Sequence, residues 1–324
     1  MTLSVAIVIP VLNDWESCHI LFSHIDRLTL AGVDRVAVFV VDDGSTKPVP
    51  ADFLDGLGQG RIGSIAIVDL VCNVGHQRAI ALGVATCSEI VADHHVVVMD
   101  SDGEDQPADI ERLIEALRTN PGAIAVAERA RRSEGAKFRA GYATYQALFR
   151  ALVGRRIDFG NFCALPPEHA RRLASTPDTW NHLAAALLRS RVPLVRVPVH
   201  RGTRYAGRSS MNVPALIAHG LSAFAVFSDN VFSRLFLFAS ALGGLSVVGG
   251  LVVVFIRFVI NVGVPGWATV ALGVFLTLFM QAILLCLLGA IQMLSTRSQA
   301  GAQPTAMARL YVRGVRSLPL APGH

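Results

Sequence analysis

Charged residues are scarce in this chain of 324 residues. Asp, Glu, Lys and Arg make up 16% of it, whereas 52% of its residues are hydrophobic. Soluble globular domains usually contain about 25% charged residues, so the composition argues against a purely soluble protein. The net charge of +5 is modest, and we expect no nucleic-acid partner. At this length the chain can hold one large domain or two smaller ones.

The sequence also shows no closely spaced cysteine pairs and no pattern of a cleavable leader. The cysteines are scattered and form no Cys-x-x-Cys pair, which argues against a disulfide framework or a zinc site and fits a reducing compartment. The N-terminal sequence MTLSVAIVIPVL has no basic leader and a short apolar run, so it predicts a buried strand. Residues 56–60 (GLGQG) do not follow the first strand, and we interpret them as a loop instead of a dinucleotide fingerprint. The five cysteines are Cys18, Cys72, Cys87, Cys163 and Cys286.

The hydrophobic excess is concentrated in two charge-free runs, 235–256 and 268–295. As a helix the first run would be roughly 33 Å long, enough for the hydrocarbon core of a bilayer. We therefore predict two transmembrane helices within 235–296. Two buried helices of a soluble core are the alternative, but runs this long with so many glycines are more typical of membrane spans.

The basic residues indicate an orientation. The tail, 297–324, carries four arginines and no acid, whereas the turn between the two runs has only Arg257. Two spans also return the chain to its starting side. By the positive-inside bias we expect the tail and the large N-terminal domain to lie in the cytoplasm, in a multi-pass protein of the plasma (inner) membrane.

Short strands and helices alternate over the first two hundred residues. Apolar runs rich in Val and Ile are separated by segments with helical spacing, which predicts an α/β fold with a mostly parallel sheet covered on both faces. Polar clusters follow the strands (NDWE, DDGS, CNVGHQ and DSDGED), at the edge where such sheets bind ligands, so we predict one pocket there. The expected strands are 5–10, 36–41, 65–70 and 96–99, and the expected helices are about 15–28, 76–92 and 107–118.

The last of these clusters carries Asp100 and Asp102. Residues two apart in a strand point to one side, so these carboxylates can converge where the fourth strand ends. Without compensation each would raise the pKa of the other. A divalent cation removes that cost, and oxygen ligands favour Mg²⁺ or Mn²⁺, an ion suited to binding a diphosphate. A solvated acidic loop is the alternative.

Five segments, in this order, resemble the family 2 glycosyltransferases: VIPVLND, VVDDGS, NVGHQRAIALG, DSDGEDQPADI and GNFCALPPEHARRL. The resemblance is closest to the polyprenyl-phosphate sugar transferases, which include dolichol-phosphate mannose synthase and the bactoprenol-linked glucosyl and aminoarabinosyl transferases. It extends to about residue 295. It implies a cytoplasmic, Rossmann-like GT-A domain over 1–212, an amphipathic juxtamembrane segment over 213–234, and then the two spans and the basic tail.

The family also implies an activity. A nucleotide-diphospho-sugar would donate a sugar, with inversion, to the phosphate of a membrane isoprenoid, giving a polyprenyl-phosphate-linked sugar for cell-envelope glycan or glycolipid modification. UDP is our preferred nucleotide, by analogy. Because the acceptor phosphate is already anionic, little general base is needed, and alignment and charge stabilisation remain as the tasks of the protein. Many relatives form tetramers through their membrane helices.

Individual residues take their implied roles from the family motifs. Asp100 and Asp102 match the Asp-x-Asp motif, and Glu104 sits where relatives often carry a Gln that completes the metal shell. The implied metal ligands are Asp102 and Glu104, and the implied cofactor is Mg²⁺ or Mn²⁺. The residues implied to bind the nucleotide-sugar are Pro10, Asn13, Asp14, Asp42, Asp43, Asn73, His76, Gln77 and Asp100.

One position departs from the family pattern. Many relatives have Gly-Asp-Phe where this chain has Gly160-Asn161-Phe162. Asn161 cannot act as a base, so either Asp158 substitutes for the carboxylate or the change tunes sugar specificity. The catalytic candidates are Asp100, Asp102, Asp158 and Asn161.

Basic residues predict the acceptor side. Residues 129–156 contain eight basic residues and one acid, with an aromatic stripe at helical spacing. This pattern favours a helix on a membrane surface, although the stripe alone also fits a helix packed on the sheet. The segment HRGTRYAGRSSMN matches a basic family loop, and guanidinium groups bind phosphate oxygens well. The candidates for lipid-phosphate binding are Arg129, Arg132, Arg201, Arg204 and Arg208.

Two other functions fit part of the pattern. A processive polysaccharide synthase of the same superfamily would carry a Gln-x-x-Arg-Trp signature and more spans, and neither occurs in the sequence. A non-catalytic, membrane-anchored nucleotide-sugar-binding relative would account for Asn161. The intact pair of Asp100 and Asp102 and the arginine loop 201–208 argue against that second alternative.

Overall fold

The computed structural model describes residues 3–129, 136–206, 213–260, 266–298 and 301–319. The chain divides into two compact units. The larger unit is built from residues 1–140, 157–226 and 301–324, and the smaller one from residues 141–156 and 227–300.

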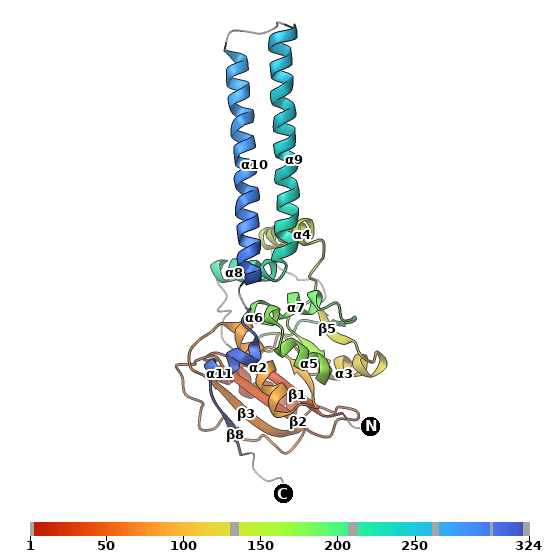
Figure 1. Ribbon diagram of the computed structural model, residues 1–324. Coiled ribbons are helices and arrows are strands. Elements are labelled where there is room, and N and C mark those ends of the chain that lie inside the picture. The colour runs from red at the N-terminus through yellow and green to blue at the C-terminus, as the bar shows by residue number, and fades with distance from the viewer. Residues whose placement is uncertain (1–2, 130–135, 207–212, 261–265, 299–300, 320–324) are drawn as a thin grey trace. The chain divides into compact units, whose positions relative to one another are not determined.

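A mixed, mostly parallel sheet forms the centre of the larger unit (Figure 1). In the described residues it has eight strands in the order β7-β5-β6-β4-β1-β2-β3-β8. Strands β4, β1, β2 and β3 are parallel neighbours, as are β5 and β7, whereas β6 and β8 run antiparallel to their neighbours. The strands are β1 (Val5–Val11), β2 (Val36–Asp42), β3 (Ile62–Leu70), β4 (His95–Val98), β5 (Ile124–Arg129), β6 (Cys163–Leu165), β7 (Leu194–Val199) and β8 (Val312–Leu318).

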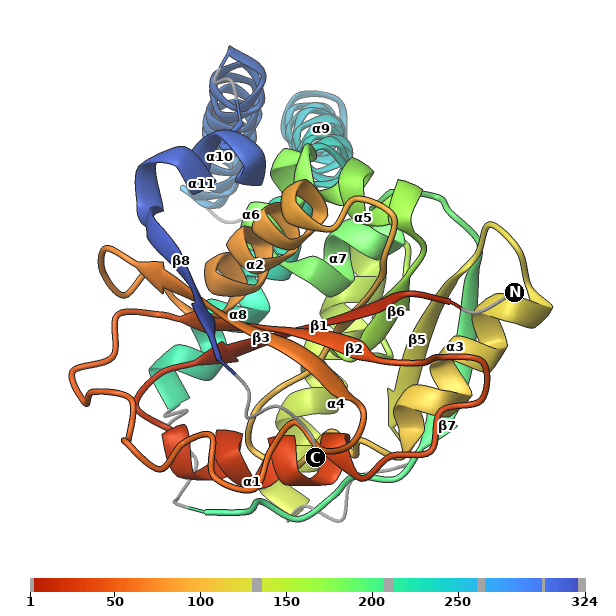
Figure 2. The same cartoon turned by 90° about the horizontal axis from the view of Figure 1, so that it is seen from below.

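Helices cover both faces of this sheet, as Figure 2 shows for α1 on one face and α2 on the other. Along β1, Ile7 and Ile9 pack in the core that contains α1, whereas Ala6 and Val8 pack in the core that contains α2. Burial on both faces explains why the strands consist of continuous Val and Ile runs. The α/β prediction is confirmed. The helices of this unit are α1 (Trp15–Asp26), α2 (His76–Ile90), α3 (Asp109–Thr119), α5 (Pro167–Ala174), α6 (Pro177–Asn181), α7 (Leu183–Arg189), α8 (Val213–Val226) and α11 (Pro304–Tyr311).

Part of the predicted basic tail, 297–324, is folded into the larger unit. Residues 304–318 form α11 and β8, and β8 pairs antiparallel with β3 at the edge of the sheet. The sequence of β8, VRGVRSL, shows little apolar alternation because most of its side chains are exposed. Its place in the sheet depends on backbone pairing, which leaves no hydrophobic pattern to detect.

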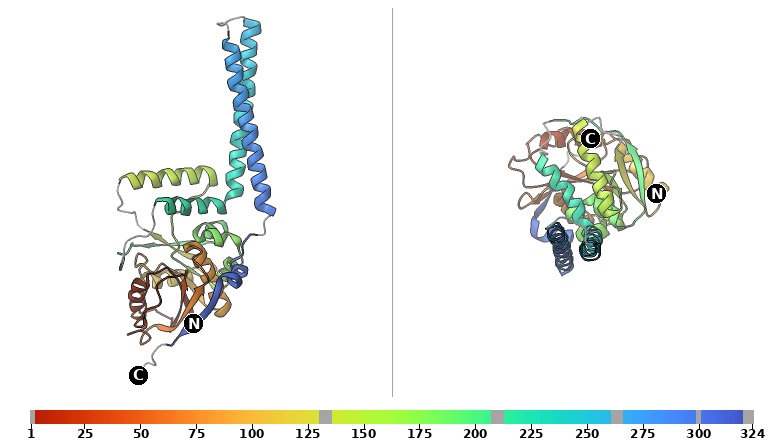
Figure 3. Two further views of the ribbon diagram at one scale, coloured as in Figure 1. Left: turned by 90° about the vertical axis from the view of Figure 1, so that its left-hand side faces the viewer. Right: turned by 90° about the horizontal axis from the view of Figure 1, so that it is seen from above.

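Two long helices dominate the smaller unit (Figures 1 and 3). They are α9 (Ser228–Phe255), which continues as a π-helical turn over Ile256–Ile260, and α10 (Trp267–Ser298). They run side by side, with Gly249 packed so closely against the ring of Phe275 that a side chain at this position would collide with the ring. The unit also contains residues 141–156, which include most of α4 (Ala136–Val153), and the Arg234 side chain of α9 donates to the carbonyl of Ala151 at 2.5 Å.

Both long helices are apolar enough to cross a membrane. Their most apolar windows have mean hydropathies of 2.2 and 2.5, and only 17% and 6% of the residues in these windows are buried. Such exposure does not fit the buried core helices of a soluble unit. The predicted runs 235–256 and 268–295 lie within these helices apart from the last residue of the first run, which opens the π-helical turn. The expected juxtamembrane segment, 213–234, divides at Phe227, where α8 has ended and α9 has not begun.

Candidate active site

The loops that follow β1, β2, β3 and β4 are joined by hydrogen bonds and an ion pair at one edge of the sheet. The N–H of Asn13 donates to Oγ of Ser45. The Asp43 carboxylate accepts the N–H of Val74, and His76 contacts Asp100. Each of the four polar clusters predicted from the sequence therefore contributes to one network. Parallel strands bring these loops together because their carboxyl ends share an edge.

Asn13 and Asp42 hold the loop after β2. Oδ1 of Asn13 accepts the backbone N–H groups of Thr46 and Lys47, each at 2.9 Å. Oδ1 of Asp42 accepts the N–H of Ser45 at 2.8 Å. Asn13 has a φ of 58°, in the left-handed region that Asn tolerates better than most residues. These side chains shape the loop, whereas Pro10 lies buried within β1 and Asp14 precedes α1.

Asp43 fixes the turn that leads into α2. Its carboxylate is buried and accepts the N–H groups of Val74 at 2.7 Å and Gly75 at 3.1 Å. Burial raises the pKa of Asp43, and these two hydrogen bonds and His76 counteract part of that rise. Gly44 lies against the same turn, where an added Cβ would be 2.6 Å from the backbone nitrogen of Asn73. Asn73 itself is exposed.

Gln77 and Asn161 have fixed amide orientations. Oε1 of Gln77 accepts the backbone N–H of Leu183 at 2.8 Å, and because a backbone N–H can only donate, the other end of this carboxamide is its NH₂ group. That group donates to Oδ1 of Asn161 at 3.0 Å. Nδ2 of Asn161 consequently lies 3.1 Å from Nε2 of His76. Asn161 thus directs a donor, not an acceptor, at the histidine.

Nε2 of His76 has two partners with opposite requirements. Nδ2 of Asn161 donates to a lone pair, whereas Oδ1 of Asp100, at 3.2 Å, accepts a proton. The nitrogen carries either a lone pair or a proton, so it satisfies one partner at a time. Burial lowers the pKa of His76, but the nearby carboxylates of Asp100, Asp43 and Asp102 raise it by more.

The acidic loop after β4 is compact. Oδ1 of Asp102 accepts the N–H of Glu104 at 2.9 Å, and the buried carboxylate of Asp105 accepts the N–H of Asp100 at 3.1 Å. Burial raises the pKa of Asp102, and the charges of Asp100 and Glu104 raise it further. Among the described residues, no three His, Cys, Asp or Glu side chains gather around a common point.

Two arginines form ion pairs with carboxylates of this loop. Nη2 of Arg204 lies 2.5 Å from Oδ2 of Asp102, and Nη2 of Arg201 lies 2.5 Å from Oε1 of Glu104. The backbone reinforces the contact, because the N–H of Tyr205 donates to the carbonyl of Asp102 and that of Gly202 to the carbonyl of Glu104, both at 2.9 Å. We call residues 201–205 the arginine strap.

The ring of Tyr205 completes the strap. It lies over Gly103, where an added Cβ would be 2.7 Å from the ring, and it stacks on His24 of α1 with the centroids 5.3 Å apart. Gly103, with a φ of 88°, therefore has no space for a side chain. Neither Tyr205 nor His24 was predicted as a site residue, since a single aromatic residue, in a loop or on a helix, carries no local pattern.

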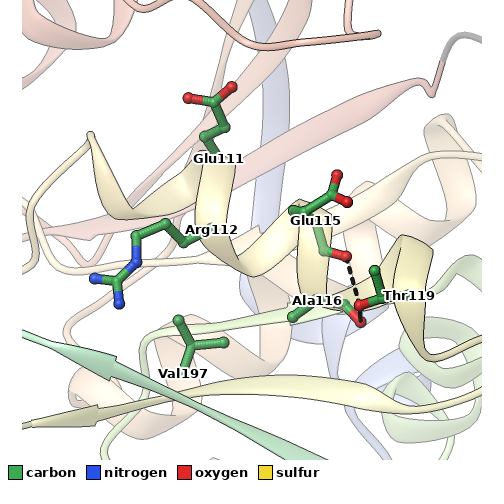
Figure 4. Close-up of a pocket in the computed structure, with 6 residues that line it drawn as sticks. All are labelled: Glu111, Arg112, Glu115, Ala116, Thr119 and Val197. Carbon is green, nitrogen blue, oxygen red and sulfur yellow. Dashed lines mark hydrogen bonds between the residues drawn. The ribbon is translucent and has the colours of Figure 1, made fainter.

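The other predicted residues lie elsewhere. Asp158 accepts from Nε and Nη2 of Arg196 on β7, both at 3.3 Å. Arg132 and Arg208 lie outside the described residues, and Arg129 ends β5 with a side chain that is not described. A hollow of about 570 Å³ lies between α3 and β7 (Figure 4), and no residue that we predicted for the site lines it.

The sequence of this chain is similar to those of known glycosyltransferases. The sequence model of the family "Glycosyl transferase family 2" matches residues 6–175, just over half of the chain. A Synechocystis protein named uncharacterized glycosyltransferase sll0501 is 22% identical over 302 residues, covering 90% of this chain and 89% of its own.

Two solved structures are similar to this chain at a low level. Glucosyl-3-phosphoglycerate synthase of Mycobacterium tuberculosis, crystallised with Mn²⁺, uridine-diphosphate-glucose and phosphoglyceric acid, is 20% identical with a TM-score of 0.47, covering 70% of this chain and 79% of its own. A mycobacterial protein is also 20% identical, with a TM-score of 0.49, covering 71% of this chain and 74% of its own. Similarity at this level does not transfer a ligand from one chain to another.

The Gln77 network leads to a stability prediction. In Gln77→Ala, the buried N–H of Leu183 loses its acceptor, and we expect the variant to be less stable by about 1–3 kcal/mol. Thermal unfolding of the detergent-purified protein measures this loss as a lower Tm. Gln59→Ala, at an exposed glutamine, is the matched control and should leave the Tm unchanged. Equal Tm values for Gln77→Ala and the unmodified protein would contradict the assignment.

Proposed function

Because this chain belongs to glycosyl transferase family 2, we propose that it transfers a sugar from a nucleotide-diphospho-sugar, preferably a UDP-sugar, to a polyprenyl phosphate. The product is a polyprenyl-phosphate-linked sugar for cell-envelope glycan or glycolipid modification. The transfer takes place at the cytoplasmic face of the plasma (inner) membrane. Assembly into a tetramer through the membrane helices belongs to the same proposal.

One observation carries the choice of a membrane acceptor. The chain leaves the larger unit after Val226, forms two apolar helices of membrane length, and returns to the same unit at residue 301. Both ends of this helical pair therefore lie on one face of any bilayer that the pair spans. An enzyme whose transfer site lies in the unit that such a helical pair interrupts is tied to the surface where a lipid-linked phosphate is found.

The acidic loop fits a divalent cation. Oδ2 of Asp102 and Oε1 of Glu104 each lie 2.5 Å from a guanidinium nitrogen. Both carboxylates therefore already bind positively charged groups of the protein. Oxygen donors of this kind suit Mg²⁺ or Mn²⁺. We propose Asp102 and Glu104 as the ligands, with Asp100 directed to the nucleotide-sugar. When bound, the ion would offset the charge that builds on the leaving diphosphate.

The remaining side chains align the reactants. A polyprenyl phosphate is anionic at neutral pH and attacks the anomeric carbon without a protein base, which agrees with an amide at Asn161. In-line attack inverts that centre. Asp158, engaged by Arg196, is the weaker candidate for a catalytic carboxylate. Asn161 directs one N–H at His76 and has a second N–H with which to hold an oxygen of the donor.

Loss of one carboxylate tests the activity. In Asp102→Ala, we expect transfer of labelled sugar from a UDP-sugar to polyprenyl phosphate to fall by about 100-fold or more, because charge on the leaving group is no longer offset. Radiolabelled lipid product in membranes of an overexpressing strain measures this rate. Asp52→Ala, at an exposed residue, should transfer at the original rate. Unimpaired transfer by Asp102→Ala would refute the proposed role.

The same assay separates the alternatives. Labelled product with a UDP-sugar or a GDP-sugar identifies the donor. A polymer in place of a single lipid-linked sugar would favour a processive polysaccharide synthase. Nucleotide binding without any product would favour a non-catalytic relative.

The competing arginine gives a second prediction. Removing the guanidinium of Arg204 leaves Asp102 without its protein cation, so we expect Arg204→Gln to bind Mn²⁺ about fivefold more tightly in the absence of nucleotide. Electron paramagnetic resonance of unbound Mn²⁺ reports this affinity. Arg112→Gln, which loses the same charge from a pair with Asp109, controls for long-range electrostatics. Equal affinities in the two variants would count against a cation site at Asp102.

A further inference from the structure

We propose that residues 304–318, which follow the second long helix, are a positioning element of the donor site. This C-terminal segment holds the loop 71–75 and the first turn of α2, which place His76 beside Asp100. The inference rests on the proposed function, because it assigns the segment to the site that binds the nucleotide. Nothing in the sequence pattern of the segment indicates this role.

Backbone pairing brings the segment to the loop. β8 pairs with β3 from Ile65 opposite Leu318 to Leu70 opposite Val312. Beyond the last of these pairs, the N–H of Val71 donates to the carbonyl of Tyr311 at 2.9 Å. The first residue of the loop is therefore bound to the C-terminal segment before the chain turns toward α2.

A bidentate ion pair fixes this pairing. Nε and Nη2 of Arg316 donate to the two carboxylate oxygens of Asp69, at 2.5 and 2.7 Å. Asp69 lies two residues before the loop. A bidentate arginine–carboxylate pair restricts the relative orientation of the two side chains as well as their separation. The ion pair therefore holds β8 in register against the end of β3 that leads into the loop.

Helix α11 supports the first turn of α2. Ala308 is buried in the core that contains Ala79 and Ile80 of α2. The ring of Tyr311 lies 5.8 Å from that of Trp180, and the guanidinium of Arg78 lies 5.4 Å from the Trp180 ring. The residue next to Gln77 is thereby connected to the C-terminal segment through one aromatic ring.

The loop is thus held from two sides. Asp43 binds its later residues, Val74 and Gly75, from the β2 side, and Tyr311 binds Val71 from the β8 side. The exposed Cys72 and Asn73 lie between these two anchors. Weakening one anchor shifts the start of α2, and with it the 3.2 Å contact between His76 and Asp100.

Charge reversal in the full-length, detergent-purified protein tests this role. We expect Arg316→Asp, which places a carboxylate against Asp69, to weaken binding of UDP in the presence of Mn²⁺ by about tenfold. Amide hydrogen exchange over residues 71–76 should accelerate, while exchange in α3 stays unchanged. Arg316→Gln, a milder change in case the reversal prevents folding, should shift both readouts in the same direction.

Two further variants make the test specific. The charge swap of Asp69→Arg with Arg316→Asp should restore both UDP affinity and protection of 71–76. Arg35→Asp, at an exposed residue just before β2 and outside the segment, should match the unmodified protein. Unchanged UDP affinity and exchange in Arg316→Asp, or equal losses in Arg35→Asp, would overturn the proposal.

The exchange measurement keeps the two proposals apart. If the unmodified protein binds neither UDP nor GDP, the proposed function fails. Exchange over 71–76 still decides whether the C-terminal segment holds the loop.

Discussion

The arrangement of this molecule depends on neutralising carboxylates that crowd one edge of a parallel sheet. Asp43, Asp100, Asp102 and Glu104 follow β2 and β4, and burial raises the pKa of both Asp43 and Asp102. The protein offsets this cost with donors aimed at each group. Backbone N–H groups bind Asp43, His76 contacts Asp100, and arginines bind Asp102 and Glu104. A loop so acidic is stable only because each carboxylate has such a partner.

The groups that bind these carboxylates come from distant parts of the chain. A ligand that binds at the acidic loop would therefore also affect the contacts between these parts. Arg204 reaches Asp102 across 102 positions of sequence, and the arginine strap that carries it also makes two backbone hydrogen bonds to the acidic loop. In the proposed function, a divalent cation at Asp102 would compete with this guanidinium for the same carboxylate. Such an exchange would replace one positive partner by another and so avoid an uncompensated charge. It would also leave a guanidinium beside the site to bind an anionic group.

Much of the fold could be predicted because its signals are local. β1 is buried on both faces and α3 has an apolar stripe, so each produced a clear pattern. Parallel strands also made it possible to place Asp43, His76 and Asp100 at one edge. The partners of these residues could not be predicted, since Gln77 meets Asn161 across 84 positions without any periodic signal. Guanidinium groups form bidentate pairs with both phosphate and carboxylate, so the sequence could not distinguish a lipid phosphate from Asp102 as the partner of Arg204.

The position of the helical pair within the chain has a consequence for folding. β3 lies at the edge of the sheet until β8 pairs with it, and β8 follows both long helices in the sequence. During synthesis, β3 therefore keeps unpaired backbone groups until α9 and α10 have been made, and an open strand edge of this kind invites pairing with other chains. Because β8 pairs with a strand that precedes α9, any bilayer that the helical pair spans must be crossed twice before the sheet can be completed. Completion of the sheet therefore depends on a segment that is made after both long helices.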